Sequence, residues 1–352
     1  RLIQESNYLS KLNSCMKEKV QFAAINPFGL IESKVPEEKY LDKDNSVISW
    51  GTKNDYPDYL LSLYNDVGTL RTVINGCIDY TRGNEIQGPY PELLDKLFRD
   101  YWIYGGCCMQ AIRNRIGETK FVYLDFRKVR SNKSGDTFYY SDDWSKSWGR
   151  CKYLTYPKFD INSNQPTGLI YVKNVYNQTY PTPVYGAKTT IQACEIEKEI
   201  TNYHYNSILN GFSGGYLFDF HNGIPEDKEK EEIEKDIIEK YSGSGNAQRI
   251  LLNFAEDENH GLTLSKLETE DFGEKYQSLI KKSQQEIFSA FRANPNLFGL
   301  PTENLGFNNE EYEATFRLFN RTMIKPVQKM FINLFRELGV EVSIVPFSLD
   351  LD

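Results

Sequence analysis

The stretch of this 352-residue chain that most resembles a reactive motif is VYGAKTT, Val184 to Thr190. Phosphate-binding loops of the form G-x-x-x-x-G-K-[ST] hold phosphate oxygens with backbone amides and a lysine. The first glycine of that pattern is missing here, so the backbone cradle is not expected. A second stretch, Gly243 to Gln248 (GSGNAQ), has two glycines and precedes an apolar run, whereas a dinucleotide fingerprint follows a strand. Neither stretch predicts a nucleotide site.

Histidine and cysteine, the usual zinc ligands, are few and scattered. No C-x-x-C pair occurs, and none of the six cysteines lies at zinc-finger spacing from His204, His221 or His260. We expect the cysteines to be buried free thiols of a reducing compartment, with a redox or metal role and disulfides as the alternatives. His204 is expected to be a half-buried structural residue and not a base. No cofactor and no metal site is predicted.

Carboxylates are abundant, but their pattern indicates a surface. The run EDKEKEEIEKD, Glu226 to Asp236, is interpreted as the solvated face of a helix. Neither a G-x-S-x-G nucleophile turn nor an H-E-x-x-H zinc motif occurs in the sequence. No catalytic residue is therefore assigned. An enzyme with an unrecognised carboxylate pair, as in glycosidases, is kept as an alternative.

The composition predicts a folded, acidic protein. Hydrophobic residues make up 40% of the chain and aromatic residues 14%, which is enough for a substantial core. The net charge is −8, whereas a tight sequence-independent DNA binder carries an excess of Lys and Arg. No run of about 18 apolar residues occurs, so no membrane span is expected.

Over the first 223 residues, the sequence pattern predicts a body of mixed helices and strands. An extended arm with one short helix is expected over the first 60 residues. Apolar residues at helical spacing predict helices over residues 69–80, 91–113 and 187–210. The pair Gly105–Gly106 predicts a break or very close packing within the second of these helices. Short aromatic and β-branched runs between residues 121 and 184 predict a small, largely antiparallel sheet, and SGGYLFDF a further strand.

The second part of the chain predicts projecting elements. The charged stretch Glu226–Tyr241 is a helix with one narrow apolar stripe, and QRILLNF and LTLSKL are the two strands of a hairpin. A helix then runs to about Arg292, and a loop dense in Asn, Pro and Gly follows it. From Asn309 the longest periodic helix begins; Pro326 must kink it and Gly339 ends it. Its expected apolar stripe comprises Tyr312, Phe316, Phe319, Met323, Val327, Met330, Leu334 and Leu338.

Four segments in this order resemble the portal proteins of tailed bacteriophages, of the kind common in long-tailed phages and prophages. The segments are YNSILNGFSGGYLFDF, YSGSGNAQRILLNF, SQQEIFSAFRANPNLFGL and NNEEYEATFRLFNRTMIKP, which begin at Tyr205, Tyr241, Ser283 and Asn308. The resemblance is strongest from Tyr203 to Leu338. It implies an α+β portal fold that assembles as a ring of about twelve copies, because a head-to-tail contact that closes on itself makes a ring.

The resemblance also divides the chain into parts. It implies a wing over residues 1–223, a first stem helix over 224–241, a clip with a β-hairpin over 242–272, a second stem helix over 273–293, a tunnel loop over 294–308, and the kinked helix with a final wing or crown-side strand over 309–352. After Gly339 the sequence holds a short strand-like run where the resemblance implies a helical crown.

Site residues follow from these parts by position. The tunnel loop lines the narrowest point of the implied DNA channel with Asn294, Asn296, Leu297, Phe298, Leu300, Thr302, Asn304 and Leu305. On the second stem helix, Lys275, Lys281 and Lys282 lie either near DNA or at a subunit contact or outer face. The clip docks partner proteins, and its candidate residues are Arg249, Glu256, Asp257, Glu258, Asn259 and His260.

The partners that the resemblance implies belong to a virion. They are further copies of the chain, double-stranded DNA passing without sequence specificity, the terminase large subunit, the head–tail adaptor and the major capsid protein. The implied location is one capsid vertex, after assembly in the host bacterial cytoplasm. A head–tail connector ring without a packaging role is the alternative; it predicts a shorter chain and no kinked helix after the loop.

Overall fold

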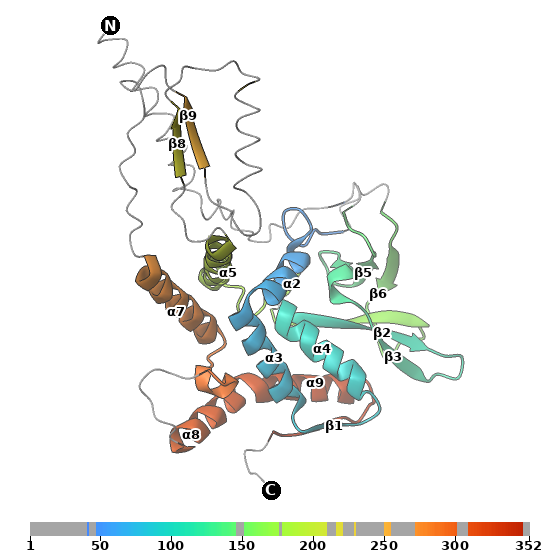
Figure 1. The fold of residues 1–352 in the computed structure, drawn as a ribbon. Coiled ribbons are helices and arrows are strands. Elements are labelled where there is room, and N and C mark those ends of the chain that lie inside the picture. Colours follow the sequence, from blue (N-terminus) through green and yellow to red (C-terminus); the bar gives the residue numbers. More distant parts are fainter. Residues whose placement is uncertain are drawn as a thin grey trace. The chain divides into compact units, whose positions relative to one another are not determined.

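The computed structural model describes residues 41, 47–145, 151–175, 178–209, 216–220, 229, 250–254, 272–300 and 309–347. The chain divides into two compact units, one formed by residues 1–195 and 282–352, the other by residues 196–281. Figure 1 shows the elements of both units. The predicted mixture of helices and small antiparallel sheets is confirmed, whereas the first 40 residues lie outside the described ones.

Three helices open the first unit. They are α2 (Tyr56–Asp66), α3 (Gly68–Arg82) and α4 (Pro91–Tyr104). Prolines stand in the first turns of α2 and α4, where a missing backbone N–H costs nothing. Because apolar residues recur at helical spacing on α3, its inner face is fully buried and packs against α4.

The helix expected over residues 91–113 is wrong in its second half. The helix ends at Gly105, which is left-handed with a φ of 79°, and Gly106–Arg113 form strand β2 instead. A side chain at Gly106 would meet the carbonyl oxygen of Val172 at 2.5 Å, so the close packing expected at this glycine pair is present. Pairing with a distant strand therefore outweighed the local helical pattern.

Two antiparallel three-stranded sheets follow. The first has the order β3–β2–β7, with β3 at Thr119–Tyr123 and β7 at Thr167–Lys173. The second has the order β4–β5–β6, formed by Val129–Ser131, Thr137–Tyr140 and Leu154–Pro157. A short 3-10 turn, η1 (Phe126–Lys128), leads into β4.

A two-stranded ribbon joins the two halves of the first unit. Strand β1 (Glu85–Gln87) pairs antiparallel with β10 (Ser343–Val345), so that Glu85 lies opposite Val345. The terminal strand was predicted, whereas its partner was not, because three residues give no periodic signal. The ribbon fixes the end of the last helix beside the start of α4.

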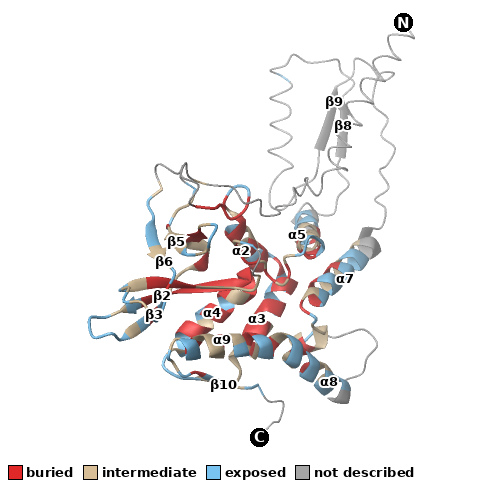
Figure 2. Cartoon of the chain, turned by 180° about the vertical axis from the view of Figure 1, so that it is seen from behind, coloured by how far each residue is buried: buried red, intermediate tan, exposed pale blue. Residues whose placement is uncertain are grey.

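The core of the first unit is aromatic. Figure 2 shows the buried residues gathered on β2 and α3, with α8 largely exposed. Trp50 is fully buried, stacks on Tyr180 at 4.8 Å and meets Phe126 edge-on. Beside it the buried Arg130 donates to the backbone carbonyls of Asn54 and Val129, both at 2.9 Å. Burial lowers the pKa of the Arg130 guanidinium, because a charged group is unfavourable in an apolar interior. The carbonyl oxygens offset this cost by accepting hydrogen bonds from the guanidinium.

The last helices run through the C-terminal part. Helix α7 (Phe272–Ala290) begins in the second unit and ends in the first, where Ile287 and Phe288 are buried. After α7 come the 3-10 turn η4 (Pro295–Phe298), helix α8 (Asn309–Phe319), the π turn η5 (Asn320–Ile324) and helix α9 (Lys325–Glu337). The kink predicted at Pro326 is present as this π turn directly before the proline, and Gly339, with a φ of 77°, follows the end of α9 as predicted.

The second unit has few described residues. Helix α5 (Lys188–Leu209) enters it, and strands β8 (Tyr216–Phe220) and β9 (Ile250–Phe254) form a parallel pair. The sequence predicted both strands but not this pairing; LTLSKL, the predicted hairpin partner of β9, lies outside the described residues. Apart from Glu229, which is helical, the predicted charged helix Glu226–Tyr241 lies outside them too. None of the described helices is both long and apolar enough to span a bilayer.

Candidate functional site

The segment after α7 turns sharply and then caps a 3-10 turn. Arg292 has a φ of 50°, and the amide of Ala293 donates to the Phe288 carbonyl at 3.0 Å. The Asn294 side chain accepts from the amide of Asn296 at 3.1 Å, which caps η4 in the way that Asn caps a helix. Pro295 fills the first position of this turn and Gly299 ends it with a φ of 77°. The first part of the predicted tunnel loop is therefore a defined turn.

Two apolar residues of this segment anchor it to α3. Leu297 is 6% exposed, and its carbonyl accepts from the Tyr80 hydroxyl at 2.8 Å. A Cβ built on Gly76 would lie 2.5 Å from two ring carbons of Phe298, so this ring fills the space that a side chain at position 76 would take. The sequence assigned Leu297 and Phe298 to a channel lining. The structure buries Leu297 in the chain's own core and packs the partly buried Phe298 against that core, so both side chains hold the segment to the body.

Tyr80 stands at the centre of the aromatic cluster that holds the segment. Its ring lies 6.1 Å from that of Phe298 and 5.7 Å from those of Phe316 and Phe319. Phe347, just after β10, meets it at 5.4 Å. Burial raises the pKa of Tyr80, so its hydroxyl remains a donor over the whole physiological range. The cluster links α3, η4, α8 and the chain after β10.

The other described candidates of this segment are more exposed than Leu297. Asn294 and Asn296 are half-buried, and Leu300 is 37% exposed. The remaining candidates of the predicted tunnel loop, Thr302, Asn304 and Leu305, lie outside the described residues.

The π turn η5 shifts the buried face of the last helix by one residue. Of the predicted stripe, Phe316, Phe319 and Val327 are buried. Ile324, Phe331 and Phe335 are buried instead of the predicted Met323, Met330 and Leu334, each one position later. In a π turn the backbone bond spans five residues, as shown by the Lys325 amide, which bonds to the Asn320 carbonyl. A π turn accommodates one extra residue within a helix and interrupts its regular hydrogen bonding. Such turns often lie at functional sites.

The lysines of α7 lie on its solvent side. Lys281 and Lys282 are exposed, and the next residue, Ser283, is 4% exposed on the packed side. Gln284 donates to the Thr69 hydroxyl at 3.4 Å, which sets the rotation of this end of the helix. The side chain of Lys275 and all six clip candidates, Arg249, Glu256, Asp257, Glu258, Asn259 and His260, lie outside what the structure describes.

Known proteins resemble this chain in fold and not in sequence. No family model matches the chain, and no curated protein matches it by sequence. Among solved structures, a chain of the virion of a native gene transfer agent (GTA) particle aligns with a TM-score of 0.51 and 13% identity, over 91% of this chain and 88% of that one. The neck of the native GTA particle, computed with C12 symmetry, gives 0.50 and 14% over the same shares. The chain shares its overall fold with these two chains.

A further solved structure is described as an HK97 family phage portal protein from Corynebacterium diphtheriae; it aligns with a TM-score of 0.46 and 10% identity, over 81% of this chain and 94% of that one. The two GTA alignments show that the chain shares its fold with chains of that virion and its neck. The α+β class is confirmed with it.

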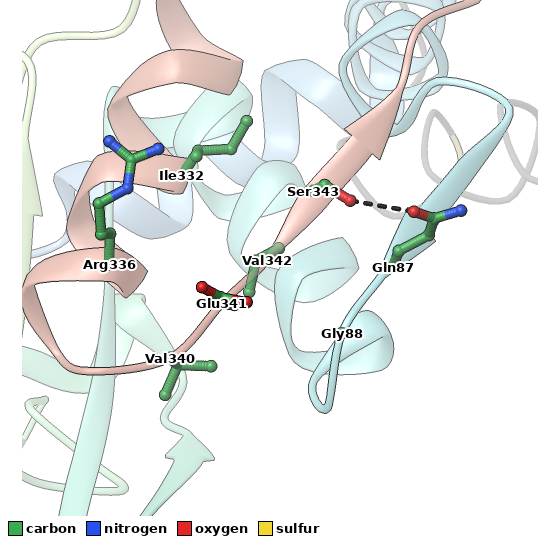
Figure 3. A pocket seen from close by; sticks show the side chains of 8 residues that line it. All are labelled: Gln87, Gly88, Ile332, Arg336, Val340, Glu341, Val342 and Ser343. Carbon is green, nitrogen blue, oxygen red and sulfur yellow. Dashed lines mark hydrogen bonds between the residues drawn. The ribbon is translucent and has the colours of Figure 1, made fainter.

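A shallow pocket of about 410 Å³ lies beside the β1–β10 ribbon. Figure 3 shows Arg336 and Ile332 of α9 on one side of it, Glu341 before β10, and the Ser343 hydroxyl bonded to Gln87 at 3.1 Å. One cation and one carboxylate with neighbouring amides and hydroxyls provide neither a paired-acid site nor an activated nucleophile. The pocket does not support the enzyme alternative.

Other reactive groups among the described residues have structural surroundings. No group of three or more His, Cys, Asp or Glu in the described part could hold a metal ion. The five described cysteines are free, and four of them are buried, as expected. In the loop-like VYGAKTT stretch, Tyr185 is fully buried and donates to the Ile103 carbonyl at 2.7 Å. His204 lies half-buried against the rings of Tyr203 and Tyr276, as expected for a structural residue.

Proposed function

We propose that this chain is a portal-type subunit, of which copies form a ring at one capsid vertex. The observation that carries the proposal is the likeness of the fold to GTA virion and neck chains over 91% of this chain. The neck of that particle was computed with C12 symmetry, and a ring of about twelve copies is proposed here. The genome enters and leaves through the centre of the ring.

The parts of the chain take the roles that their order suggests. Residues 1–223 form the wing, α7 belongs to the second stem helix, and the segment after α7 approaches the channel axis. The charged stretch 224–241 forms the first stem helix, and residues 242–272 form the clip that docks the terminase large subunit and later the head–tail adaptor. The major capsid protein surrounds the wing. These assignments follow from the sequence resemblance to portal proteins, and all of them depend on the chain forming a ring.

The geometry of the segment after α7 is consistent with a constriction. Phe298 and Leu297 fix its base to α3, so its outer residues are held at a set distance from the body. Asn294, Asn296 and Leu300 carry no charge. A neutral rim lets DNA pass, because each phosphate that a cation neutralises adds salt-dependent affinity and slows sliding.

Electron microscopy of the purified full-length chain tests the ring. We expect axial views with a central hole and, by mass photometry, a species near 490 kDa if twelve subunits of 40.9 kDa assemble. A stable monomer at micromolar concentration under packaging buffer conditions, with no ring on addition of capsid protein, would contradict the proposal.

A packaging assay separates a portal from a connector ring without a packaging role. Empty capsids assembled with the chain should protect DNA from nuclease when the terminase and ATP are added. Rings that join heads to tails but protect no DNA favour the connector alternative. Lys275, Lys281 and Lys282 are tested in the same assay: reversing all three charges should alter packaging if they lie near DNA. Unchanged DNA length and salt sensitivity would assign them to the outer face or a subunit contact.

A further inference from the structure

The helix that crosses the π turn is a positively charged stretch of an acidic chain. From Arg317 to Arg336 the sequence has five cations and no Asp or Glu, although the whole chain carries −8. Four of these cations, Arg317, Arg321, Lys325 and Lys329, are spaced four residues apart. All four are exposed. The spacing and exposure together define a surface row, which we call the basic row.

The π turn is what keeps these four residues in a row. In a continuous α-helix, three steps of four residues would rotate the last cation by about 120° from the first. One additional residue in the π turn takes back about 100° of that rotation. Over the roughly 18 Å from Arg317 to Lys329 the cations therefore stay on one side of the helix.

The aromatic core fixes which way this side faces. On the opposite side Phe319, Ile324, Val327, Phe331 and Phe335 are buried. Phe331 meets Phe98 of α4 at 5.0 Å and Tyr101 at 5.8 Å, which prevents rotation of the helix about its axis. Figure 1 shows α8 and α9 following one another, in orange to red, with α9 crossing near the ends of α3 and α4. The basic row is thus held outward by a rigid base.

Three of the four cations of the row pair with no described acid of the same unit. Arg317 forms an exposed ion pair with Glu313 at 3.1 Å. No carboxylate among the described residues pairs with Arg321, Lys325 or Lys329. Since exposed ion pairs contribute little stability and these three form none, their clustering is not explained by folding.

We propose that the basic row binds the sugar-phosphate backbone of double-stranded DNA without sequence specificity. A phosphate backbone is a continuous row of negative charge, and Lys or Arg clustered along one helix is the footprint that matches it. A protein partner fits less well, because among the described residues the row has only one exposed large apolar neighbour, Leu318 at 63%, and two of its four members are lysines, which are depleted in protein interfaces. About four phosphate contacts bind weakly at physiological salt, which permits sliding. The inference rests on the proposed function only in taking DNA as the polyanion.

The test uses the full-length chain and a fluorescein-labelled 30-base-pair duplex of arbitrary sequence. We expect wild-type binding at 50 mM salt, with a slope of log K against log salt near −3.6, from about 0.9 for each of four contacts. The variant Arg321→Gln, Lys325→Gln, Lys329→Gln should reduce the slope to about −0.9. A second duplex of unrelated sequence should give the same values.

Matched controls separate the row from general charge. Arg115→Gln, Lys120→Gln, Lys133→Gln removes the same charge from exposed positions on strand β3 and in two turns between strands, and should leave the slope unchanged. Arg321→Lys, Lys325→Arg, Lys329→Arg should bind as the wild type does.

Two outcomes overturn the proposal: the wild type does not bind the duplex at 50 mM salt, or the control variant loses as much of the salt slope as the Gln variant of the row. If the Gln variant loses its ring in electron microscopy but keeps its DNA slope, the row is a contact between copies. If the wild type forms rings but does not bind the duplex, the proposal for the basic row fails and the proposed function as a ring-forming subunit still holds.

Discussion

The ring of Phe298 occupies the place of a side chain at Gly76: a Cβ on that glycine would lie 2.5 Å from two of its carbons. The two residues are far apart in sequence and come from α3 and from the turn after α7. Phe288, at 5.8 Å, and Phe319, at 5.7 Å, close the remaining sides of the ring. The turn is therefore locked to α3 by a fit that depends on the absence of one methyl group.

Gly76→Ala should loosen this turn. Alanine is the better helix former by about 1 kcal/mol, but the added methyl group must displace a ring that its neighbours enclose. Overpacking of this kind costs about 1–3 kcal/mol, so we expect a net loss of stability measured by urea unfolding. Gly68→Ala, in the same helix with no atom within 4 Å of the added Cβ, is the control and should be neutral or stabilising. A Gly76→Ala protein as stable as the control variant would show that the ring moves freely.

Tyr80→Phe should weaken the same attachment by a different route. It keeps the ring contacts and removes the hydroxyl that donates to Leu297 at 2.8 Å. Loss of one partly buried hydrogen bond is expected to cost about 0.5–1.5 kcal/mol. Hydrogen exchange at the amides of residues 294–300 should rise more than exchange elsewhere. Tyr205→Phe, at a side chain that is 63% exposed, should change neither quantity. Uniform acceleration across the chain would argue against a local anchor.

Asp100 should make stability depend on pH. Burial raises the pKa of this carboxyl to about 8, against a smaller opposing effect of the Tyr123 hydroxyl, which donates to it at 3.0 Å. Asp125 raises the pKa further and Arg127 lowers it. The folded state thus holds a proton that the unfolded chain releases near pH 4, so the free energy of unfolding falls as pH rises from about 4 to 8, by up to about 1.4 kcal/mol per unit.

Asp100→Asn should flatten that dependence, because the amide has no proton to lose and still accepts from Tyr123. The measurement is urea unfolding between pH 5 and 8.5. Asp79→Asn, at an exposed carboxylate of α3, should keep the wild-type slope. Parallel curves for the wild type and Asp100→Asn would mean that Asp100 does not titrate in this window.

Deleting Thr322 should be far more harmful than substituting it. Without one residue of η5 the helix continues as an α-helix, and everything after it rotates by about 100°. Val327, Phe331 and Phe335 would then leave the core, and we expect a cooperative loss of the folded state in thermal unfolding. Thr322→Ala removes only a bond to the Leu318 carbonyl at 2.8 Å and should change stability by less than about 0.5 kcal/mol. A deletion variant that melts like the wild type would refute the register argument.

Periodic patterns predicted the long elements well. Helices α3, α5, α7, α8 and α9 all lie where apolar residues recur at helical spacing, because burial of one face favours a helix in any context. The same reasoning failed at residues 106–113, where Cys, Met, Gln and Ala suit both structures and the pairing of β2 with β7 decided the outcome.

Contacts between distant residues were beyond local reasoning. The parallel pairing of β8 with β9 and the β1–β10 ribbon join strands that no short window contains together. The π turn moved the buried set by a single position, from Met330 to Phe331, which a regular period does not foresee. In the turn after α7 no period exists at all. The residue type therefore predicts that Phe298 is apolar, but nothing in its neighbourhood predicts that its ring packs against α3.

The β1–β10 ribbon has a consequence for how the chain can vary. Because residues 85–87 and 343–345 are paired, the early and late segments of the first unit are joined directly, and residues 196–281 are an excursion that leaves through α5 and returns through α7. Such a loop of chain can lengthen, shorten or be exchanged between lineages while the body that anchors it keeps its registers. A single gene can in this way keep one scaffold and change what it presents to other proteins.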